Sequence, residues 1–146
     1  MQKIEIPDDA VVGFVCGAFD LFHAGHAILL EACSSYCDYL IVGLQTDPSV
    51  DRKEKNKPIQ TMFERFSQLV SHKYVDLIIP YDTEKDLINL IASIDIDFRF
   101  LGTDYLGKSF TGQELCEQKG IEIIYIDRYH DFSTSELRKR IVDAGI

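Results

Sequence analysis

Two histidines beside glycines are the residues of this chain best suited to chemistry. The stretch 13–26 reads Gly-Phe-Val-Cys-Gly-Ala-Phe-Asp-Leu-Phe-His-Ala-Gly-His, and it places His23 and His26 three residues apart. An apolar run ends at Gly17, and apolar residues resume from Ala27 at helical spacing, so both histidines fall on one side of a first helical turn. A helix N-terminus presents unpaired N–H groups and a partial positive charge. Imidazoles beside such donors suit a phosphate whose charge grows during a reaction.

A second group of candidate anion ligands lies near the C-terminus. Residues 133–136 read Ser-Thr-Ser-Glu, a capping box in which Ser133 caps a helix and Glu136 reaches back to it. Arg128 lies shortly before this box and adds a planar guanidinium fork. Free hydroxyl and N–H groups at such a helix N-terminus bind oxyanions. An ordinary cap is the alternative, and one segment can serve as both.

A charged loop follows the second apolar run. Residues 51–57 read Asp-Arg-Lys-Glu-Lys-Asn-Lys and contain no apolar anchor. A solvated surface loop is the usual interpretation of such a segment. Because it follows a predicted strand, it is also expected at the ligand edge of the sheet, where its lysines can close over a triphosphate.

The elements that must position these residues alternate along the chain. Apolar runs predict strands at about 11–16, 39–44, 75–79, 98–101 and 121–126, the third of them stopped by Pro80. Helices are expected at about 25–36, 60–72 and 111–119, the last of which should stop at Gly120. Two more should begin at caps, one at Asp82 or Thr83 and the other at Ser133. The second helix should bury an apolar face made of Met62, Phe63, Phe66, Leu69 and Val70. The last helix should bury an apolar stripe made of Leu137, Ile141 and Val142.

This alternation predicts a single α/β domain over residues 1–146. We expect a Rossmann-like, doubly wound parallel sheet of about five strands with helices on both faces. Ligands of such folds bind beyond the carboxyl ends of the strands, near the switch in strand order. The segments 17–26, 102–105 and 128–133 each follow a predicted strand, so we expect them to meet at that edge.

Composition excludes several classes of function. A net charge of −9 over 146 residues argues against a sequence-independent nucleic-acid binder. No apolar run approaches the length of a membrane span, and residues 1–9 do not read as a signal peptide. The four cysteines form no C-x-x-C pair, and Cys33 and Cys37 read as small core residues rather than metal ligands. We therefore expect a reduced, cytoplasmic protein.

The segment 17–26, G-A-F-D-L-F-H-A-G-H, resembles the hallmark of the cytidylyltransferase-like nucleotidyltransferases. Residues 128–135 resemble the second signature of that family, R-T-x-G-I-S-T-T/S, and residues 102–105 resemble its G-x-D-W segment. The resemblance covers about residues 11–142. Within the family it is nearest to the glycerol-3-phosphate cytidylyltransferases, through the compact length, the lysine loop, D-x-x-G-K at 104–108 and the F-S-T-S ending.

The resemblance implies a role for each matching residue. The catalytic group around the α-phosphate would be His23 and His26 with Lys53 and Lys55 of the loop, where Lys57 is a less favoured choice. Arg65 and Tyr105 would serve the acceptor or pair with phosphate, and a structural role is the alternative for Arg65. The implied nucleotide-binding residues are Gly17, Ala18, Phe19, Asp20, Gly25, Gly102, Asp104, Arg128, Ser133 and Thr134.

The reaction implied is nucleotidyl transfer. A phosphate oxygen of a small phosphorylated alcohol, with glycerol 3-phosphate favoured, would attack the α-phosphorus of CTP in line, and pyrophosphate would leave. Mg²⁺ is expected on the triphosphate, held through phosphate oxygens and water, and no side chain is assigned as its ligand. The family also implies a homodimer.

Three departures from the family pattern affect the base and acceptor pockets. Ala18 stands where Thr is usual, Tyr105 stands where relatives have Trp, and residues 129–131 replace Thr-x-Gly. Two alternatives therefore remain open. One is an adenylyltransferase that uses ATP and acts on a sugar phosphate or on a flavin or pantetheine phosphate. The other is a nucleotide-binding regulatory module without turnover.

Overall fold

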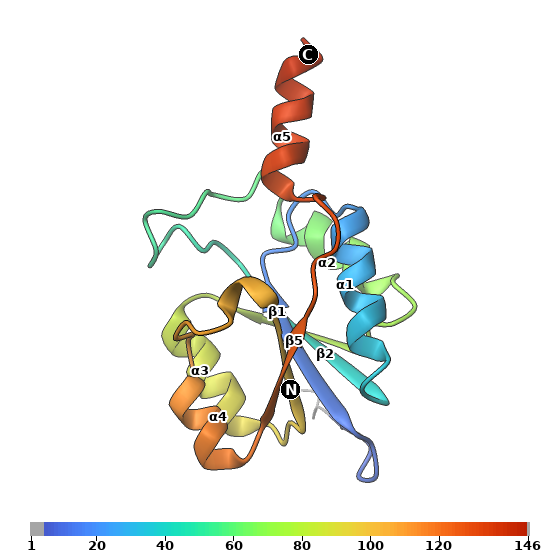
Figure 1. The fold of residues 1–146 in the computed structure, drawn as a ribbon, viewed down its shortest axis with the longest axis vertical. Helices are drawn as coiled ribbons and strands as arrows, with labels where there is room; N and C mark the ends of the chain where they lie inside the picture. The colour runs from blue at the N-terminus through green and yellow to red at the C-terminus, as the bar shows by residue number, and fades with distance from the viewer. Residues whose placement is uncertain (1–4, 146) are drawn as a thin grey trace.

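A five-stranded parallel sheet forms the middle layer of the computed structural model, which describes residues 5–145 (Figure 1). The strand order is β3-β2-β1-β4-β5, as in a doubly wound sheet. The strands are β1 (Val12–Gly17), β2 (Tyr39–Gln45), β3 (Leu77–Tyr81), β4 (Phe98–Gly102) and β5 (Glu122–Ile126). The predicted Rossmann-like fold class is confirmed.

Helices follow the strands in turn, and their ends match the capping signals. They are α1 (Ala24–Ser34), α2 (Met62–Val70), α3 (Glu84–Ser93), α4 (Gln113–Lys119) and α5 (Thr134–Asp143), with a short 3₁₀ turn, η1, at Thr103–Tyr105. Thr83 caps α3, Ser133 caps α5, and Gly120 ends α4 in the left-handed conformation at φ 70°.

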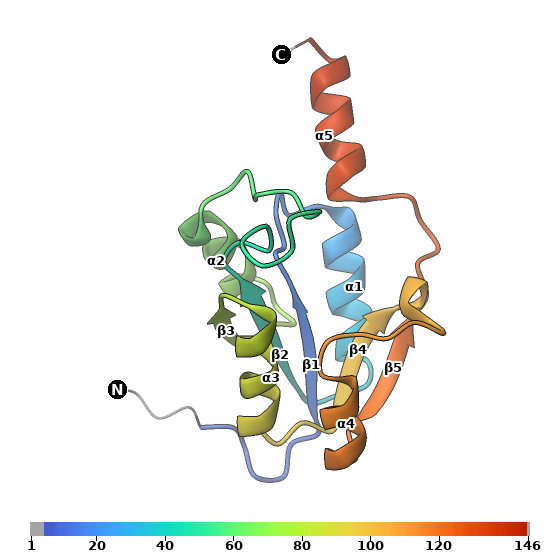
Figure 2. The ribbon, with the colours of Figure 1, turned by 90° about the vertical axis from the view of Figure 1, so that its left-hand side faces the viewer.

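Two hydrophobic cores lie on opposite faces of the sheet. Leu30 and Cys33 of α1 and Leu69 of α2 pack against Val15 and Val42 on one face. On the other face, α3 and α4 pack against β1 and β2 through Leu87, Ile91, Cys116, Phe14 and Ile41. Figures 1 and 2 show α1 and α2 on one side of the sheet and α3 and α4 on the other.

The strand order reverses beside β1. β1 pairs with β2 on one side, with Val12 opposite Tyr39, and with β4 on the other, with Gly13 opposite Phe98. The connections after β1 and β4 therefore leave in opposite directions and open a crevice at the carboxyl edge. Residues 18–23 follow β1 at this edge, and η1 follows β4 there.

The prediction that Pro80 stops the third strand is wrong. Pro80 lies inside β3 and is paired in register with Leu44. Because β3 is at the edge of the sheet, a missing N–H on its outer side removes no ladder hydrogen bond.

The predicted apolar face of α2 is mostly in solvent. Leu69 is fully buried, but Phe63 is 80% exposed and Val70 is 59% exposed. Arg65 is instead the second buried residue of this helix. The face turned toward the sheet is thus chosen by the polar contacts of Arg65, described below.

The predicted buried stripe of the last helix is also wrong. Ile141 and Val142 are 43% and 72% exposed, and α5 contains no buried residue. Figures 1 and 2 show α5 projecting away from the sheet, so only its first turns adjoin the rest of the domain. Of the helices within residues 5–145, none has the length and apolar character needed to cross a bilayer.

Candidate active site

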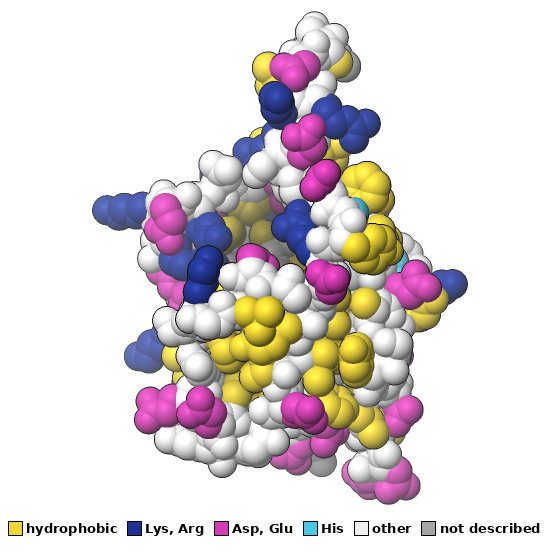
Figure 3. Space-filling view, viewed as in Figure 1, with side chains coloured by type: hydrophobic (Ala, Val, Ile, Leu, Met, Phe, Trp, Pro, Cys, Tyr) yellow, Lys and Arg dark blue, Asp and Glu magenta, His cyan; other side chains and the backbone are white. Residues whose placement is uncertain are grey.

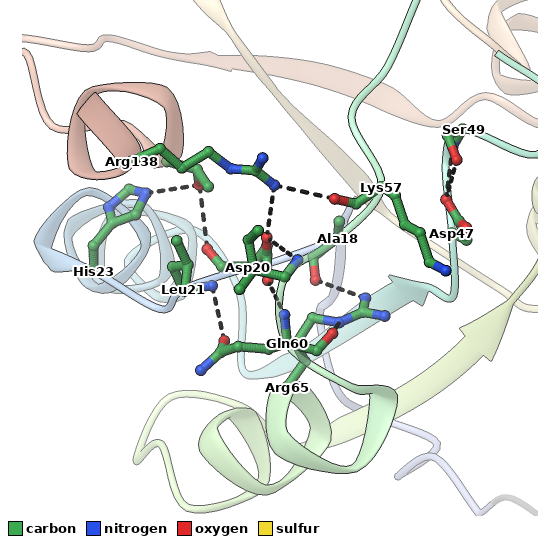
Figure 4. Close-up of polar contacts among 12 residues, drawn as sticks. Ala18, Asp20, Leu21, His23, Asp47, Ser49, Lys57, Gln60, Arg65 and Arg138 are labelled. Atoms are coloured by element: carbon green, nitrogen blue, oxygen red, sulfur yellow. Dashed lines mark hydrogen bonds and ion pairs between the residues drawn. The ribbon is translucent and has the colours of Figure 1, made fainter. Parts of the chain in front are cut away.

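The N-termini of α1 and α5 meet at the carboxyl edge of the sheet. His23 Nε2 lies 3.3 Å from Thr134 Oγ1, although 111 residues separate them. The Thr134 hydroxyl in turn donates to the backbone carbonyl of Asp20 at 3.2 Å. Figure 4 shows this chain of contacts. The expectation that the two signature segments come together is therefore confirmed.

Each histidine uses one ring nitrogen to cap α1. His23 Nδ1 accepts from the Gly25 N–H at 3.0 Å, and His26 Nδ1 accepts from the His23 N–H at 3.2 Å. The two rings stack with their centroids 3.8 Å apart. Because both Nδ1 atoms are acceptors, each neutral ring carries its proton on Nε2. His23 donates this proton to Thr134, and His26 has its own available for a ligand.

Burial keeps both imidazoles neutral. It lowers the pKa of His26 to about 3, with a further contribution from the neighbouring His23 ring. The pKa of His23 is lowered as well, first by burial and then by the positive charge of Arg128. At neutral pH the pair therefore offers neutral N–H donors rather than imidazolium charges.

The turn that carries the first signature is backbone-strained. Phe19 and Leu21 have φ values of 50° and 48°, a region that side chains other than glycine seldom adopt. Gly25 is required for space, because a Cβ there would lie 2.9 Å from the His23 ring and 3.0 Å from the Phe132 carbonyl oxygen. The geometry around the histidines is thus set by contacts that leave little freedom.

Asp20 holds three segments of the site together. Its carboxylate accepts from the backbone N–H groups of Ile59 and Gln60 at 2.8 and 2.9 Å and from Arg138 at 3.2 Å. The Leu21 N–H adds a bond of 2.8 Å to Gln60 Oε1. The carboxylate of Asp20, a residue expected to bind the nucleotide, therefore accepts hydrogen bonds from protein donors. These bonds join the first signature segment to the end of the lysine loop and to α5 (Figure 4).

Arg65 forms hydrogen bonds that connect segments of the same region beneath the site. Its guanidinium donates to the carbonyl oxygens of Ala18 at 3.1 Å, of Gln45 and Thr46 at 2.6 Å each, and of Gln60 at 3.2 Å. These carbonyls belong to the exits of β1 and β2 and to the segment before α2. The structural alternative for Arg65 is therefore observed, whereas a contact of Arg65 with phosphate stays a prediction.

Three adjoining cavities open at this edge, and we name each after an arginine. The Arg128 cavity is about 300 Å³ and includes His23, Gly25, His26, Gly102, Asp104, Arg128, His130, Phe132, Ser133 and Thr134. The Arg138 cavity is about 410 Å³ and includes Gly17, Ala18, Phe19, Asp20, His26, Lys55, Thr134, Ser135 and Arg138. The Arg99 cavity is about 540 Å³ and includes Cys16, Gly17, Ala18, Gln45, Arg52, Lys55, Arg99, Gly102, Tyr105, Ser109 and Thr111.

Shared walls connect the cavities into one groove. His26 and Thr134 line both the Arg128 and the Arg138 cavities, and Lys55 lines both the Arg138 and the Arg99 cavities. Figure 3 shows Lys and Arg side chains gathered around a hollow below α5, on a chain whose net charge is −9. The groove is thus a local basic region that suits an elongated anion.

Nearly all the predicted site residues line this groove. The exceptions are Arg65, which is buried beneath it, and Lys53, which is exposed on the loop. Of the residues that depart from the family pattern at 129–131, only His130 lines the Arg128 cavity, and Tyr129 is 76% exposed.

Sequence reasoning missed Arg138 and Arg99. Arg138 lies four residues after Thr134, so helical spacing alone places the two on one face. Arg99 is a charged residue inside an otherwise apolar strand, which is also a readable signal. Within residues 5–145, no group of three or more His, Cys, Asp or Glu side chains is arranged to hold a metal ion.

Comparisons with known proteins identify relatives of this chain. A family model described as cytidylyltransferase-like matches residues 14–140. The bifunctional protein HldE of Nitrobacter winogradskyi is 40% identical over 130 residues, which are 88% of this chain and 26% of that protein. HldE of Nitrobacter hamburgensis is 38% identical with the same coverage. The chain thus spans about a quarter of the length of these curated relatives.

Solved structures give the same fold. The lipopolysaccharide core biosynthesis protein from Thermoplasma volcanium is 25% identical at a TM-score of 0.68, covering 83% of this chain and 99% of that one. The pantothenate synthetase of Thermus thermophilus is similar in fold alone, at 14% identity and a TM-score of 0.58, covering 92% of this chain and 66% of that one.

These relatives support the family rather than the glycerol-3-phosphate member that the motifs favoured. The family model spans most of the described residues and includes both histidines, Lys55 and Thr134. The chain belongs to the cytidylyltransferase-like family.

Proposed function

We propose that this domain is a nucleotidyltransferase that moves AMP from ATP to a sugar phosphate and releases pyrophosphate. The observation that carries the proposal is the meeting of two helix N-termini at the His23–Thr134 contact, with His26 beside it. Each N-terminus offers free donors to an anion, and together they suit two ends of one triphosphate.

The triphosphate would lie along the Arg138 cavity. His26, Lys55, Thr134, Ser135 and Arg138 line this cavity. In the proposed complex, the His26 Nε2–H and the Lys55 ammonium would contact the α-phosphate, and Thr134, Ser135 and Arg138 would contact the departing phosphates. An oxygen of the acceptor phosphate forms a bond to the α-phosphorus as the bond to pyrophosphate breaks. The attacking oxygen is already ionised, so no proton has to be removed, and catalysis consists of positioning and charge stabilisation.

Mg²⁺ fits this arrangement as a partner of the nucleotide. Mg²⁺ keeps several waters and binds through substrate phosphates with one or two carboxylates. Asp104 and Asp127 line the adjoining Arg128 cavity, which shares His26 and Thr134 with the Arg138 cavity, and either could supply a carboxylate. Bound between the two cavities, the ion would neutralise phosphate charge.

A sugar phosphate and ATP are favoured over glycerol 3-phosphate and CTP. The Thermoplasma volcanium protein is described as a lipopolysaccharide core biosynthesis protein, which supports a sugar-phosphate acceptor. The Arg128 cavity has the apolar walls Ile28, Ile126 and Phe132, and His130 stacks on Phe132 at 5.0 Å. A purine offers more area to such walls than a pyrimidine. Of the departures at residues 129–131, His130 lies in this region.

The experiment is a pyrophosphate-release screen. The four nucleoside triphosphates are each paired with hexose 1-phosphates and with glycerol 3-phosphate, in the presence of Mg²⁺. We expect turnover with ATP and a sugar phosphate, reduced roughly a hundred- to a thousandfold in His26→Ala. Lys139→Ala, on the exposed part of α5, is the control and should keep full activity. Preferential turnover of CTP would restore the cytidylyl interpretation, and tight ATP binding without any pyrophosphate release would indicate a regulatory module.

A further inference from the structure

Arg99 is a buried cation inside the sheet. It is the second residue of β4, is 3% exposed, and pairs with Phe14 of β1, which places its side chain on the face covered by α3 and α4. Nη1 donates to the Thr111 carbonyl oxygen and lies 3.9 Å from Cys116 Sγ. The guanidinium carbon is 5.0 Å from the centre of the Phe110 ring.

This charge has no counter-ion in the described part of the chain. The ion pairs found within residues 5–145 are Arg52 with Glu84 and Arg138 with Asp20, and neither includes Arg99. Arg99 Nε is buried and has no hydrogen-bond partner among these residues. A buried charge is costly unless it is paired. One carbonyl, one thiol sulfur and one aromatic ring are weak compensation, so the guanidinium is suited to an anion supplied from outside.

The cavity above Arg99 can supply that anion. It is about 540 Å³, and Tyr105, Ser109 and Thr111 add polar groups to its wall. Arg52 also lines it, but its Nε is already paired with Glu84 at 2.9 Å. Within residues 5–145, Lys55 and Arg99 are thus the cations of this cavity without an acidic partner, and of these two Arg99 is the buried one.

Lys55 and Arg99 line the Arg99 cavity at different depths from the carboxyl edge of the sheet. Lys55, Gly17 and Ala18 line the boundary with the Arg138 cavity, where the triphosphate would lie. Phe14, the partner of Arg99 in the sheet, is three residues before Gly17 on β1. At roughly 3.3 Å per residue, the backbone of Arg99 lies about 10 Å below the edge. A ligand that holds its reacting phosphate at the edge would therefore direct its other end toward Arg99.

We propose that the acceptor carries a second anionic group, a carboxylate or a second phosphate, at the end away from the attacking phosphate, and that Arg99 binds it. The proposal rests on the proposed function, because it takes this cavity as the acceptor site. Arg99 then acts as a specificity-determining residue. A planar guanidinium pairs with either group through two parallel hydrogen bonds.

The test compares three acceptors that differ at one end. A hexose 1-phosphate has one anionic group, whereas a hexose 1,6-bisphosphate and a hexuronic acid 1-phosphate have two. We expect kcat/KM to be roughly tenfold to a hundredfold higher for at least one doubly anionic acceptor, mainly through a lower KM, as expected for a charge-assisted hydrogen bond. The ratio between the two doubly anionic acceptors identifies which group is preferred. Arg99→Met should abolish the preference, and Arg99→Lys should retain part of it.

A binding measurement separates this proposal from the proposed function. Calorimetry of the same three ligands, without turnover, reports the anion site alone. Preferential binding without pyrophosphate release would overturn the transferase and leave the anion site standing. Pyrophosphate release without any preference, or equal or absent binding of all three ligands to the wild type, would overturn the anion site. The wild-type comparison decides even if Arg99→Met does not fold.

Discussion

Asp20 and Arg138 form an ion pair at 3.2 Å across 118 residues of sequence. The pair joins the strained turn after β1 to α5, a helix that otherwise projects from the domain. Arg138 also donates to the Lys57 carbonyl oxygen at 3.1 Å, so the same guanidinium reaches the end of the lysine loop. The turn after β1, the end of the lysine loop and α5, which border the Arg138 cavity, are thus connected by one carboxylate and one guanidinium.

A double-mutant cycle should detect this coupling. Asp20→Ala leaves the Ile59 and Gln60 N–H groups without their acceptor, whereas Arg138→Ala leaves the Asp20 carboxylate with those two donors. We therefore expect Asp20→Ala to be the more destabilising, by about 2 kcal/mol, with a coupling energy of roughly 0.5–1 kcal/mol for the pair. Urea denaturation of the four proteins measures both quantities. Strictly additive effects would show that α5 is held by other contacts.

Arg65 should be essential for stability rather than for phosphate binding. Its four carbonyl partners lose their donors in Arg65→Met, and unsatisfied buried acceptors cost about 1–3 kcal/mol each in the worst case. We expect a loss of at least about 3 kcal/mol in the free energy of unfolding. Arg65→Lys should recover little of it, because a single ammonium cannot span acceptors on three segments. A variant that keeps its melting temperature but loses nucleotide affinity would instead assign Arg65 to the ligand.

The sequence predicted the regular elements and the signature well for physical reasons that are local. Apolar runs, Gly120 and the caps at Thr83 and Ser133 are short-range signals, and they matched the observed element ends to within about two residues in most places. The approach of His23 to Thr134 followed from the rule that carboxyl ends of parallel strands share one edge.

What could not be predicted depends on contacts between distant segments. The apolar pattern of α2 predicts that residues such as Phe63 face the sheet. In the structure, hydrogen bonds to backbone carbonyls turn Arg65 toward the sheet instead, and Phe63 is left in solvent. Ile141 and Val142 form an apolar stripe that stays largely exposed, because α5 extends past the edge of the sheet. Periodicity reports that a face is apolar and does not report what it meets.

The neutral state of His26 predicts a pH dependence of stability. Its pKa is about 3 in the folded protein against 6.5 in the unfolded chain, so the unfolded state binds more protons between these two values. Stability contributed by the neutral ring is fully present above pH 6.5 and is lost as pH falls from 6.5 toward 3, by at most about 1.4 kcal/mol per pH unit.

Nuclear magnetic resonance can follow this ring directly. The Cε1–H resonance of His26 should not titrate between pH 5 and 8 in the folded protein, and it should titrate near 6.5 in urea. His26→Gln should flatten the decline of stability below pH 6.5. A folded-state midpoint near 6.5 would contradict the neutral-donor role.

The two lysines of the loop should differ sharply in their effect on turnover. Both lysines are exposed. Lys55 lines both the Arg138 and the Arg99 cavities, at the junction where the acceptor phosphate and the α-phosphate would meet, whereas Lys53 lines none of the three cavities. A cation at that junction stabilises charge that builds up only as the new bond forms, so its loss should lower kcat more than it raises KM.

We expect Lys55→Ala to reduce kcat roughly a hundredfold and Lys53→Ala to reduce it less than about fivefold, in pyrophosphate release at saturating ATP. Lys55→Arg should restore part of the rate, because charge is kept while its position changes. Equal losses in the two alanine variants would mean that the loop rearranges when the nucleotide binds and that the positions in the free protein do not select the catalytic lysine.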